Sequence, residues 1–306
     1  MSAAAPTVPR VIEIPAKLLR NHSVKGADWL AGLPAAVERY VDQWELTVDG
    51  DPLSGEASLI LPVVRRDGTE AMLKLQSVND ESEGEALALR TWHHDDVVAG
   101  LEDDPETSTI LLERLEPRTL DDHPDPVEAT RILAELLTHL MVVPAPPGIR
   151  RLSDIAAGMI EDAPRLIPRL ADPAEQALTW RFVAQVTELL PESGDRLLHW
   201  DLHYYNVMAA KRQPWLVIDP KPLAGDPAFE LMPAVWNRWD DLVASGDLSQ
   251  AIRDRFGLML EVTGIDRDRA LGWTAGRILQ NILWFTEDGD TRIEAELKAV
   301  ADALFS

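Results

Sequence analysis

The sequence has 306 residues, of which 52 are acidic and 29 basic, so that the formal net charge is −23. A chain of this length is expected to form two domains or lobes, and its negative charge disfavours nucleic acid and anionic membrane surfaces as partners. The absence of cysteine excludes disulfides, thiolate zinc sites, iron–sulfur clusters and a cysteine nucleophile.

The N-terminal sequence MSAAAPTVPR lacks the long apolar core that follows the basic start of a secretory signal. No stretch approaches the roughly 20 uninterrupted apolar residues that a membrane span needs. We therefore expect a cytoplasmic protein that binds neither membranes nor nucleic acid. Nothing in the sequence requires more than a monomer.

The first third of the chain changes from a helical to a β-type pattern. Residues 16–44 place apolar side chains three and four apart, which predicts helices, and a further helix is predicted at 84–92. Asp67-Gly68 predicts a hairpin between two of the strands, and the acidic run 102–104 is typical of a solvated turn. Strands are expected in four short runs: 44–48, 57–64, 71–75 and 106–115.

After Pro117 the pattern becomes mainly helical. Amphipathic segments predict helices at 126–143, 153–170 and 174–190, and the chain is helical in pattern from about residue 228 to its end. The sequence therefore predicts an α+β chain. It has a β-rich N-terminal lobe at 1–115, with leading helices, and a helical C-terminal lobe at 116–306.

The densest group of polar residues is the run 199–206, which is followed by Asp219 at the end of an apolar segment. An acid on a loop, an amide five residues later and a second acid after a strand form the layout that kinase-type phosphoryl transfer needs. Asp201 would accept a hydrogen bond from the attacking hydroxyl group and take its proton. The side chains of Asn206 and Asp219 would hold Mg²⁺, because phosphates and waters fill its other positions.

A lysine and a glutamate upstream fit the same chemistry. Lys74 lies in a predicted strand, and Glu85 opens the helix that follows. The lysine could bind the α- and β-phosphates of a nucleotide while the glutamate holds it by an ion pair. Each residue also has a simpler interpretation. Lys74 could be a solubilising charge on an edge strand, and Glu85 could be a favourable acid in a first helical turn.

Taken together, these segments resemble the aminoglycoside phosphotransferases, and the similarity is greatest to the streptomycin 6-kinase and hydroxyurea phosphotransferase branch. The resemblance implies a bilobal protein-kinase-like fold. It extends over most of the chain and is carried, in order, by SGEASLILPVVRRDGTEAMLKL, GEALALRTW, TILLERLEP, LLHWDLHYYNV and VIDPKPLAGDPAFEL.

Carried over residue by residue, the resemblance implies that Asp201 is the catalytic aspartate and His199 the supporting histidine of its loop. Asn206 and Asp219 would be the Mg²⁺ ligands. One departure lies inside the motif, where Trp200 replaces the glycine of the usual His-Gly-Asp and adds bulk beside the catalytic acid.

The resemblance also implies a nucleotide site in the N-terminal lobe, formed by the lysine–glutamate pair and a hinge. The hinge would run from Glu113 to Leu115 and bind adenine through backbone C=O and N–H groups. The loop before the second predicted strand has one glycine near its tip, so that Ser54 or Ser58 would help to cover the phosphates.

The implied activity is the transfer of a γ-phosphoryl group from ATP or GTP, with Mg²⁺, to a hydroxyl group of an aminoglycoside such as streptomycin. Hydroxyurea and sugar-like molecules are alternative acceptors. The acidic surplus favours a small cationic acceptor. Acids that could pair with it follow the catalytic motifs: Glu230, Asp240, Asp241, Glu287 and Asp288.

Two alternatives from other classes use the same residues. His199, Asp201 and His203 alternate, so that on a strand they would share one face and could bind Zn²⁺ for hydrolysis. This interpretation leaves the lysine–glutamate pair unexplained. The second alternative is a kinase-like protein that binds nucleotide without catalysis, which would require a missing catalytic group.

Overall fold

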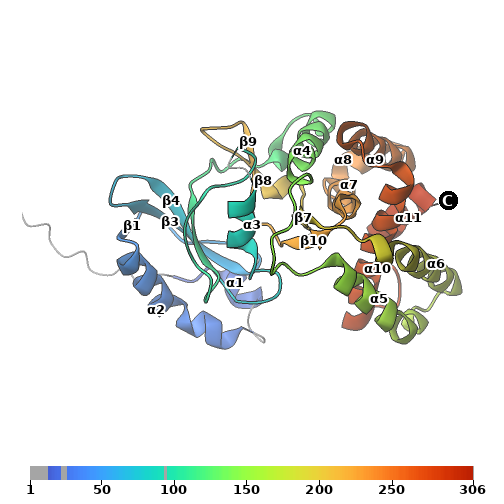
Figure 1. Ribbon diagram of the computed structural model, residues 1–306, viewed down its shortest axis with the longest axis horizontal. Coiled ribbons are helices and arrows are strands. Elements are labelled where there is room, and N and C mark those ends of the chain that lie inside the picture. The colour runs from blue at the N-terminus through green and yellow to red at the C-terminus, as the bar shows by residue number, and fades with distance from the viewer. Residues whose placement is uncertain (1–12, 22–25, 93–94, 306) are drawn as a thin grey trace, which may run out of the picture. The chain divides into compact units, whose positions relative to one another are not determined.

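The computed structural model describes residues 13–21, 26–92 and 95–305 (Figure 1). The N-terminal decapeptide, for which we expected no secretory signal, lies outside these ranges. The chain divides into two compact units, one of Met1–Ala86 with Ala99–Arg114 and one of Leu87–Val98 with Leu115–Ser306.

The division differs from the expected boundary because the segment Leu87–Val98 belongs to the second unit. The indole Nε1 of Trp92 donates a hydrogen bond to the carbonyl oxygen of Leu140, at 3.3 Å. The backbone N–H of Val98 donates to the carbonyl oxygen of Val217, at 2.9 Å. Hydrogen bonds to residues much later in the sequence therefore decide where this segment packs.

Within the described residues, the first unit is built on a six-stranded antiparallel sheet in the order β1–β3–β4–β6–β5, with β2 paired to β3. Two helices precede it, α1 (Ala16–Asn21) and α2 (Ala27–Gln43). The strands are β1 (Leu46–Val48), β2 (Leu53–Ser54), β3 (Ser58–Arg65), β4 (Glu70–Gln76), β5 (Gly100–Asp104) and β6 (Thr109–Glu113).

Helix α2 covers one face of this sheet (Figure 1). Apolar residues at the predicted spacings form the core between them: Leu30, Leu33, Val37 and Tyr40 from α2, Leu59, Leu61 and Val63 from β3, and Ala71, Leu73 and Leu75 from β4. Because side chains alternate along a strand, Lys74 points to the opposite face from Leu73 and Leu75. The expected hairpin is confirmed, since Asp67-Gly68 joins β3 to β4.

The prediction of a solvated turn at 102–104 is wrong, because these acids form most of edge strand β5. Each end of the run has a polar partner in the first unit. Glu102 pairs with Arg65 at 2.8 Å, and Asp104 accepts a hydrogen bond from the hydroxyl group of Tyr40 at 2.6 Å. An edge strand tolerates such charges because one of its sides is unpaired.

The second unit contains most of the helices, together with two small antiparallel sheets. Strand β7 (Arg196–Leu198) pairs with β10 (Leu223–Gly225), and β8 (Val207–Ala209) pairs with β9 (Trp215–Val217). Helix α3 (Glu85–Thr91) begins at the end of the first unit's segment and continues in the second. The other helices are α4 (Pro126–Leu140), α5 (Leu152–Leu166), α6 (Pro173–Leu189), α7 (Leu231–Trp236), α8 (Trp239–Ala244), α9 (Leu248–Thr263), α10 (Arg267–Asp288) and α11 (Ala295–Phe305).

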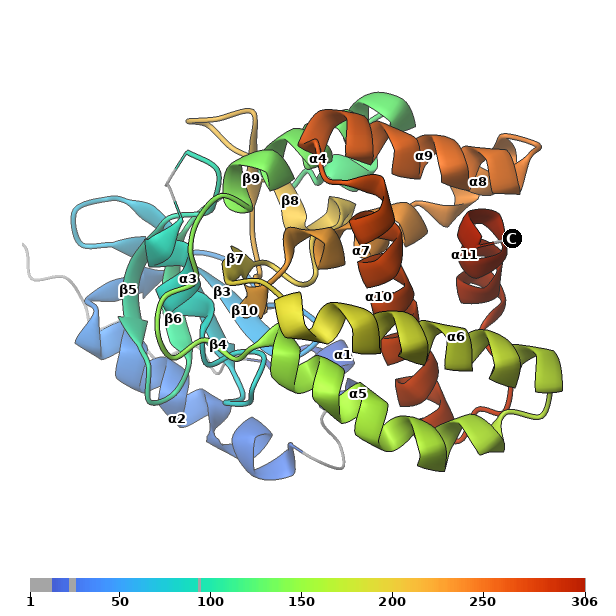
Figure 2. The same cartoon turned by 45° about the vertical axis from the view of Figure 1, so that its right-hand side comes forward.

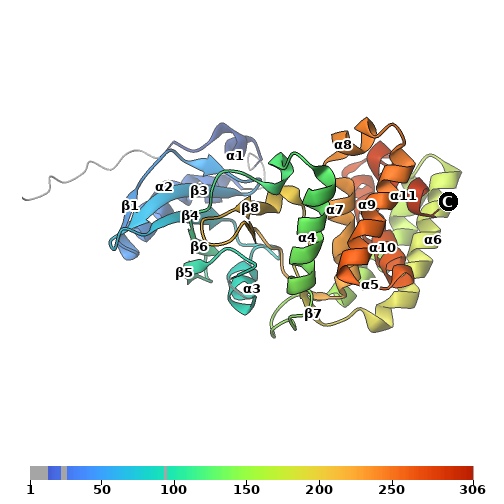
Figure 3. The same ribbon diagram turned by 90° about the horizontal axis from the view of Figure 1, so that it is seen from above.

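Helices α5, α6 and α10 pack against one another (Figure 2), and α4 lies along α9 (Figure 3). The expectation of an α+β chain, β-rich first and helical afterwards, is confirmed. Among the described residues, no helix combines the length and the apolar character that crossing a membrane would require.

Two glycines of the second unit, Gly225 in β10 and Gly158 in α5, are predicted to respond oppositely to substitution by alanine. A Cβ atom at Gly225 would lie 2.7 Å from the Cβ of Leu152 and 3.0 Å from the Cδ1 of Leu198, whereas one at Gly158, inside α5, would meet nothing within 4 Å. We expect Gly225→Ala to lower the free energy of unfolding by about 1–3 kcal/mol through overpacking. Gly158→Ala should raise it by about 0.5–1 kcal/mol, because alanine favours the helix. Urea unfolding of both variants measures the difference, and equal stabilities would contradict the packing argument.

Candidate active site

A loop between β7 and β8 carries the first group of polar residues, from His199 to Asn206. The hairpin of β8 with β9 pairs Val207 with Val217, and the pairing continues where the N–H of Ile218 donates to the carbonyl oxygen of Asn206 at 2.9 Å. This register places Asn206 and Asp219 at the same end of the hairpin. Residues 13 positions apart are thereby brought together by local strand pairing.

His199 is fully buried and bonded at both ring nitrogens. Its Nε2 donates to the carbonyl oxygen of Ile218 at 2.8 Å, and its Nδ1 accepts the backbone N–H of Asp201 at 3.3 Å. Burial lowers the pKa of His199 to about 4, so that the ring is neutral at physiological pH. The histidine therefore fixes the loop against the segment before Asp219.

The carboxylate of Glu230 binds the backbone of the same loop. Its two carboxylate oxygens accept the backbone N–H groups of His199 and Trp200, at 2.8 and 2.7 Å. Burial raises the pKa of Glu230 to about 7, while the two N–H donors act in the opposite direction. Sequence reasoning placed Glu230 among the acceptor-binding acids, and this was wrong because its side chain is only 1% exposed and both oxygens hold the loop.

Trp200 occupies a left-handed backbone conformation, with φ 68°. Its indole ring is buried, with the guanidinium of Arg150 at 3.9 Å and that of Arg277 at 4.9 Å from the ring centroid. The half-exposed ring of Trp284, on α10, meets it edge-on at 5.9 Å. The bulk expected beside the catalytic acid is therefore directed into the second unit, where two guanidinium groups stabilise the ring by cation–π contacts.

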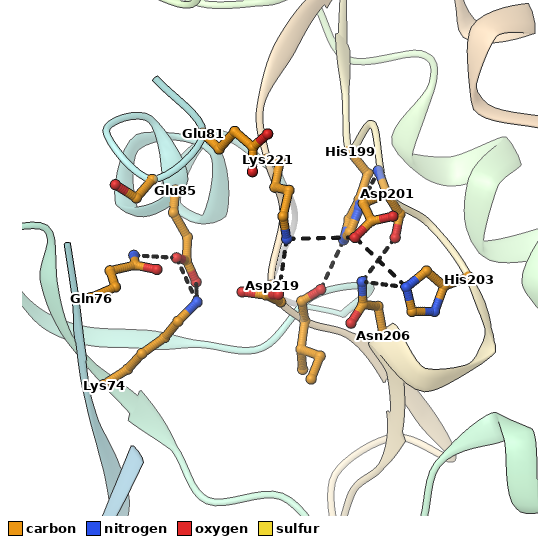
Figure 4. Close-up of polar contacts among 12 residues, drawn as sticks. Lys74, Gln76, Glu81, Glu85, His199, Asp201, His203, Asn206, Asp219 and Lys221 are labelled. Atoms are coloured by element: carbon orange, nitrogen blue, oxygen red, sulfur yellow. Dashed lines mark hydrogen bonds and ion pairs between the residues drawn. The ribbon is translucent and has the colours of Figure 1, made fainter. Parts of the chain in front are cut away.

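Asp201 stands next in the loop, with His203 and Asn206 beside it (Figure 4). The Nδ2 of Asn206 donates to the carbonyl oxygen of Asp201 at 2.8 Å and lies 3.3 Å from the Nε2 of His203. Because the amide nitrogen is engaged inside the loop, its oxygen is the end of Asn206 suited to binding a cation. Burial raises the pKa of Asp201, but contact with His203 and the charge of Lys221 lower it more strongly, to about 2.

Asp219 follows β9 and also has a left-handed backbone, with φ 56°. The ammonium group of Lys221 lies 3.1 Å from the Oδ2 of Asp219 and 3.5 Å from the Oδ2 of Asp201 (Figure 4). Sequence reasoning missed this lysine. The available signal was its place two residues after an acid that ends an apolar run.

The zinc interpretation does not fit this geometry. Both nitrogens of His199 are bonded to the protein, and residues 199–203 form a loop and not a strand. Within the part of the chain that the structure describes, no group of three or more histidines and acids could hold a metal ion.

The lysine–glutamate pair belongs to the first unit and is buried (Figure 4). The ammonium group of Lys74 lies 2.8 and 2.7 Å from the two carboxylate oxygens of Glu85, and the amide of Gln76 donates to Oε2 of the same carboxylate at 2.6 Å. Strand β4 lies between β3 and β6, so the interpretation of Lys74 as an edge-strand charge is wrong. Glu85 does lie in the first turn of α3, as its simpler interpretation has it, but it is 1% exposed and its carboxylate holds Lys74 and Gln76 as well.

The other residues predicted for the nucleotide site take part in ordinary strand contacts or lie at the start of the second unit's long segment. Ser54 ends β2 and pairs with Leu59, while Ser58 is buried. Glu113 ends β6 and donates its N–H to the carbonyl oxygen of Ala99 at 2.9 Å, so only its carbonyl group can serve a hinge contact. Leu115 is the first residue of the second unit's long segment.

Two more of the acids proposed for the acceptor already have basic partners. Asp241 pairs with Arg238 at 2.6 Å, and Glu287 pairs with Arg165 at 2.9 Å. An acceptor would have to displace these partners to use the two carboxylates.

The sequence matches the family described as aminoglycoside/hydroxyurea antibiotic resistance kinase over residues 43–289. It is 51% identical over 300 residues to a streptomycin 6-kinase of Streptomyces glaucescens, with 96% of this chain and 98% of the relative covered. It is 45% identical over 304 residues to a hydroxyurea phosphotransferase of Kitasatospora aureofaciens, with 97% and 87% covered.

Solved structures share the fold. The crystal structure of the aminoglycoside phosphotransferase APH(4)-Ia has a TM-score of 0.61 at 18% identity, covering 88% of this chain and 97% of its own. A ternary complex of a thermostable mutant of APH(4)-Ia with ADP and hygromycin B has a TM-score of 0.59 at 15% identity, covering 88% and 98%. The expected kinase-like fold is thereby confirmed.

The contacts of Glu230 predict a large stability effect. We expect Glu230→Ala to lower the free energy of unfolding by about 2–5 kcal/mol, because two buried N–H donors lose their acceptor. Glu287→Ala is the matched control, since its exposed ion pair contributes about 0–1 kcal/mol. Chemical denaturation compares the two, and equal losses would contradict the supporting role of Glu230.

Proposed function

Because the chain belongs to the aminoglycoside/hydroxyurea antibiotic resistance kinase family, we propose that it transfers the γ-phosphoryl group of ATP to a hydroxyl group of a streptomycin-like aminoglycoside. Relatives named streptomycin 6-kinase, which align with nearly the whole chain, support this acceptor and favour the hydroxyl group at position 6. A related solved structure with bound ADP supports the use of an adenine nucleotide.

One observation carries the proposal: Asp201, Asn206 and Asp219 meet around the end of the β8–β9 hairpin, as phosphoryl transfer requires. The amide of Asn206 is tied to the backbone of Asp201, and the carboxylates of Asp201 and Asp219 share the ammonium group of Lys221. Asp201 can orient a hydroxyl group, and Asn206 and Asp219 can hold the cation that accompanies a nucleotide.

In the proposed step, the acceptor hydroxyl group donates a hydrogen bond to the carboxylate of Asp201. Its oxygen forms a bond to the γ-phosphorus while the bond from that phosphorus to the β–γ bridging oxygen breaks, and ADP leaves with the electron pair. The hydroxyl proton passes to Asp201. A carboxyl group with a pKa of about 2 is a weak base, so Asp201 mainly orients the hydroxyl group and takes the proton late in the transfer.

The donor set fits Mg²⁺, because an amide oxygen and a carboxylate are hard ligands and phosphates and water complete its shell. Asn206 would offer its Oδ1, since Nδ2 is engaged in the loop, and Asp219 would offer its carboxylate. When bound, Mg²⁺ neutralises charge on the nucleotide phosphates.

We assign the nucleotide-holding roles to the first unit and its link to the second. Lys74, held by Glu85, would bind the α- and β-phosphates. The carbonyl group of Glu113 and the N–H of Leu115 would bind the adenine base, and Ser54 would help to cover the phosphates. The residues from Leu115 to Ser306 would supply the catalytic loop and the acceptor site.

The proposal of an aminoglycoside acceptor is supported by the net charge of the protein as well as by its relatives. A net charge of −23 attracts a cationic molecule such as an aminoglycoside, and carboxylates can pair with its guanidinium or ammonium groups. We propose that the protein acts as a monomer. We place the enzyme in the cytoplasm, where ATP is available.

We expect Asp201→Asn to lower kcat by about 10²–10⁴-fold, because the neutral amide orients the hydroxyl group less strongly than the carboxylate and cannot take its proton. The affinity for AMP-PNP should stay within about threefold of wild type, since Asp201 acts on the acceptor side. Asp195→Asn, an exposed acid beside β7, is the matched control. Steady-state kinetics and calorimetry measure both effects, and near wild-type turnover would exclude Asp201 from this role.

The acceptor is tested by transfer of labelled γ-phosphate from ATP and, in parallel, from GTP. The panel contains streptomycin, other aminoglycosides, hydroxyurea and simple sugars, each with Mg²⁺ and with excess EDTA. We expect labelling of streptomycin that stops in EDTA, with the position of the phosphate read by NMR. Labelling of hydroxyurea or neutral sugars alone would overturn the aminoglycoside acceptor, and full activity in EDTA would overturn the metal site.

A further inference from the structure

The ammonium group of Lys221 stands between two carboxylates that have different proposed tasks. It lies 3.5 Å from the Oδ2 of Asp201, on the acceptor side, and 3.1 Å from the Oδ2 of Asp219, on the nucleotide side. All three residues belong to the second unit, so this arrangement does not depend on the first.

The backbone of Lys221 is fixed, which limits where its side chain can reach. Its N–H donates to the carbonyl oxygen of His199 at 3.0 Å, and its own carbonyl oxygen accepts a hydrogen bond from Arg150 at 3.3 Å. The first bond connects it to the same loop that carries Asp201. The backbone of the lysine and the loop of the acid are therefore held together by a direct hydrogen bond.

The side chain is also partly open, because it is 26% exposed. The two acids that it contacts are also partly open, with side-chain exposures of 30% for Asp201 and 40% for Asp219. Here an arriving anion can meet the ammonium group, which has three donors and so can keep a carboxylate contact while binding another oxygen.

We propose that Lys221 is a catalytic residue that donates to an oxygen of the γ-phosphoryl group during its transfer. The inference rests on the proposed function, because it deepens the role of that same site. Before substrates bind, Lys221 balances the charges of Asp201 and Asp219. During transfer its ammonium group donates a hydrogen bond to an oxygen of the phosphoryl group.

The physical reason is the path of the phosphoryl group. It starts beside the cation ligand Asp219 and ends on an oxygen held by Asp201, so it must pass near a cation in contact with both. The bond to the acceptor oxygen forms, the bond to the bridging oxygen of ADP breaks, and the three equatorial oxygens carry negative charge throughout. A fixed ammonium group in that position stabilises the transition state more than the ground state.

The test compares Lys221→Met with Lys298→Met, which removes the same charge from an exposed pair on α11. Two binding probes are used with Mg²⁺: AMP-PNP for the ground state, and ADP with aluminium fluoride for the phosphoryl group in transit. We expect Lys221→Met to weaken the second probe by about 10²-fold and the first by no more than about threefold. Lys298→Met should change neither.

Kinetics give the second measurement. Lys221→Met should lower kcat by about 10²–10³-fold, with KM for ATP changed by less than about threefold. Lys221→Arg keeps the charge on a different donor group and should recover part of the loss. Equal weakening of both probes would mean a nucleotide anchor and would overturn the proposal, as would a kcat equal to that of Lys298→Met.

The two proposals can fail separately. If the wild-type enzyme binds both probes and hydrolyses ATP but labels no aminoglycoside, the proposed acceptor is wrong. The probe comparison still decides the role of Lys221, because neither probe contains an acceptor. Retained AMP-PNP binding also shows that Lys221→Met is folded.

Discussion

The carboxylate of Glu230 is the contact on which the rest of the site depends, because it holds two successive backbone N–H groups of the loop that carries Asp201. Trp200, which supplies the second of these N–H groups and directly precedes Asp201, has a left-handed backbone that costs an ordinary residue about 1–3 kcal/mol. Two charge-assisted hydrogen bonds can offset such a cost. The bend then turns the side chain of Trp200 into the unit and leaves Asp201 beside Asn206.

The second constraint is the distribution of charge in a strongly acidic protein. Asp201 and Asp219 are close enough to share the ammonium group of Lys221, whose positive charge lies next to both carboxylates. In the first unit, Lys74 is neutralised by Glu85 within a buried cluster. Buried pairs of this kind add little net stability, because desolvation opposes the attraction. Their value is to keep charged groups in defined places.

Hairpin β8–β9 connects these two constraints. Its register ties Asn206 to Ile218, while His199 reaches the carbonyl oxygen of Ile218 from the other side. The loop with the proposed base and the turn with the proposed cation ligand are therefore held together by hydrogen bonds. Phosphoryl transfer needs this, since its catalysis depends on positioning more than on covalent chemistry.

The sequence by itself determined the elements that depend on local spacing. Alternation along β4 placed Lys74 opposite the core, and the intervals between Asp201, Asn206 and Asp219 indicated one site with kinase chemistry. Those features follow from helix and strand periods, which act over a few residues. Only the tertiary structure decided that Glu230 holds the loop, that Lys221 bridges two acids and that residues 102–104 form an edge strand. Each depends on packing or pairing that the local pattern of charges and apolar residues does not encode.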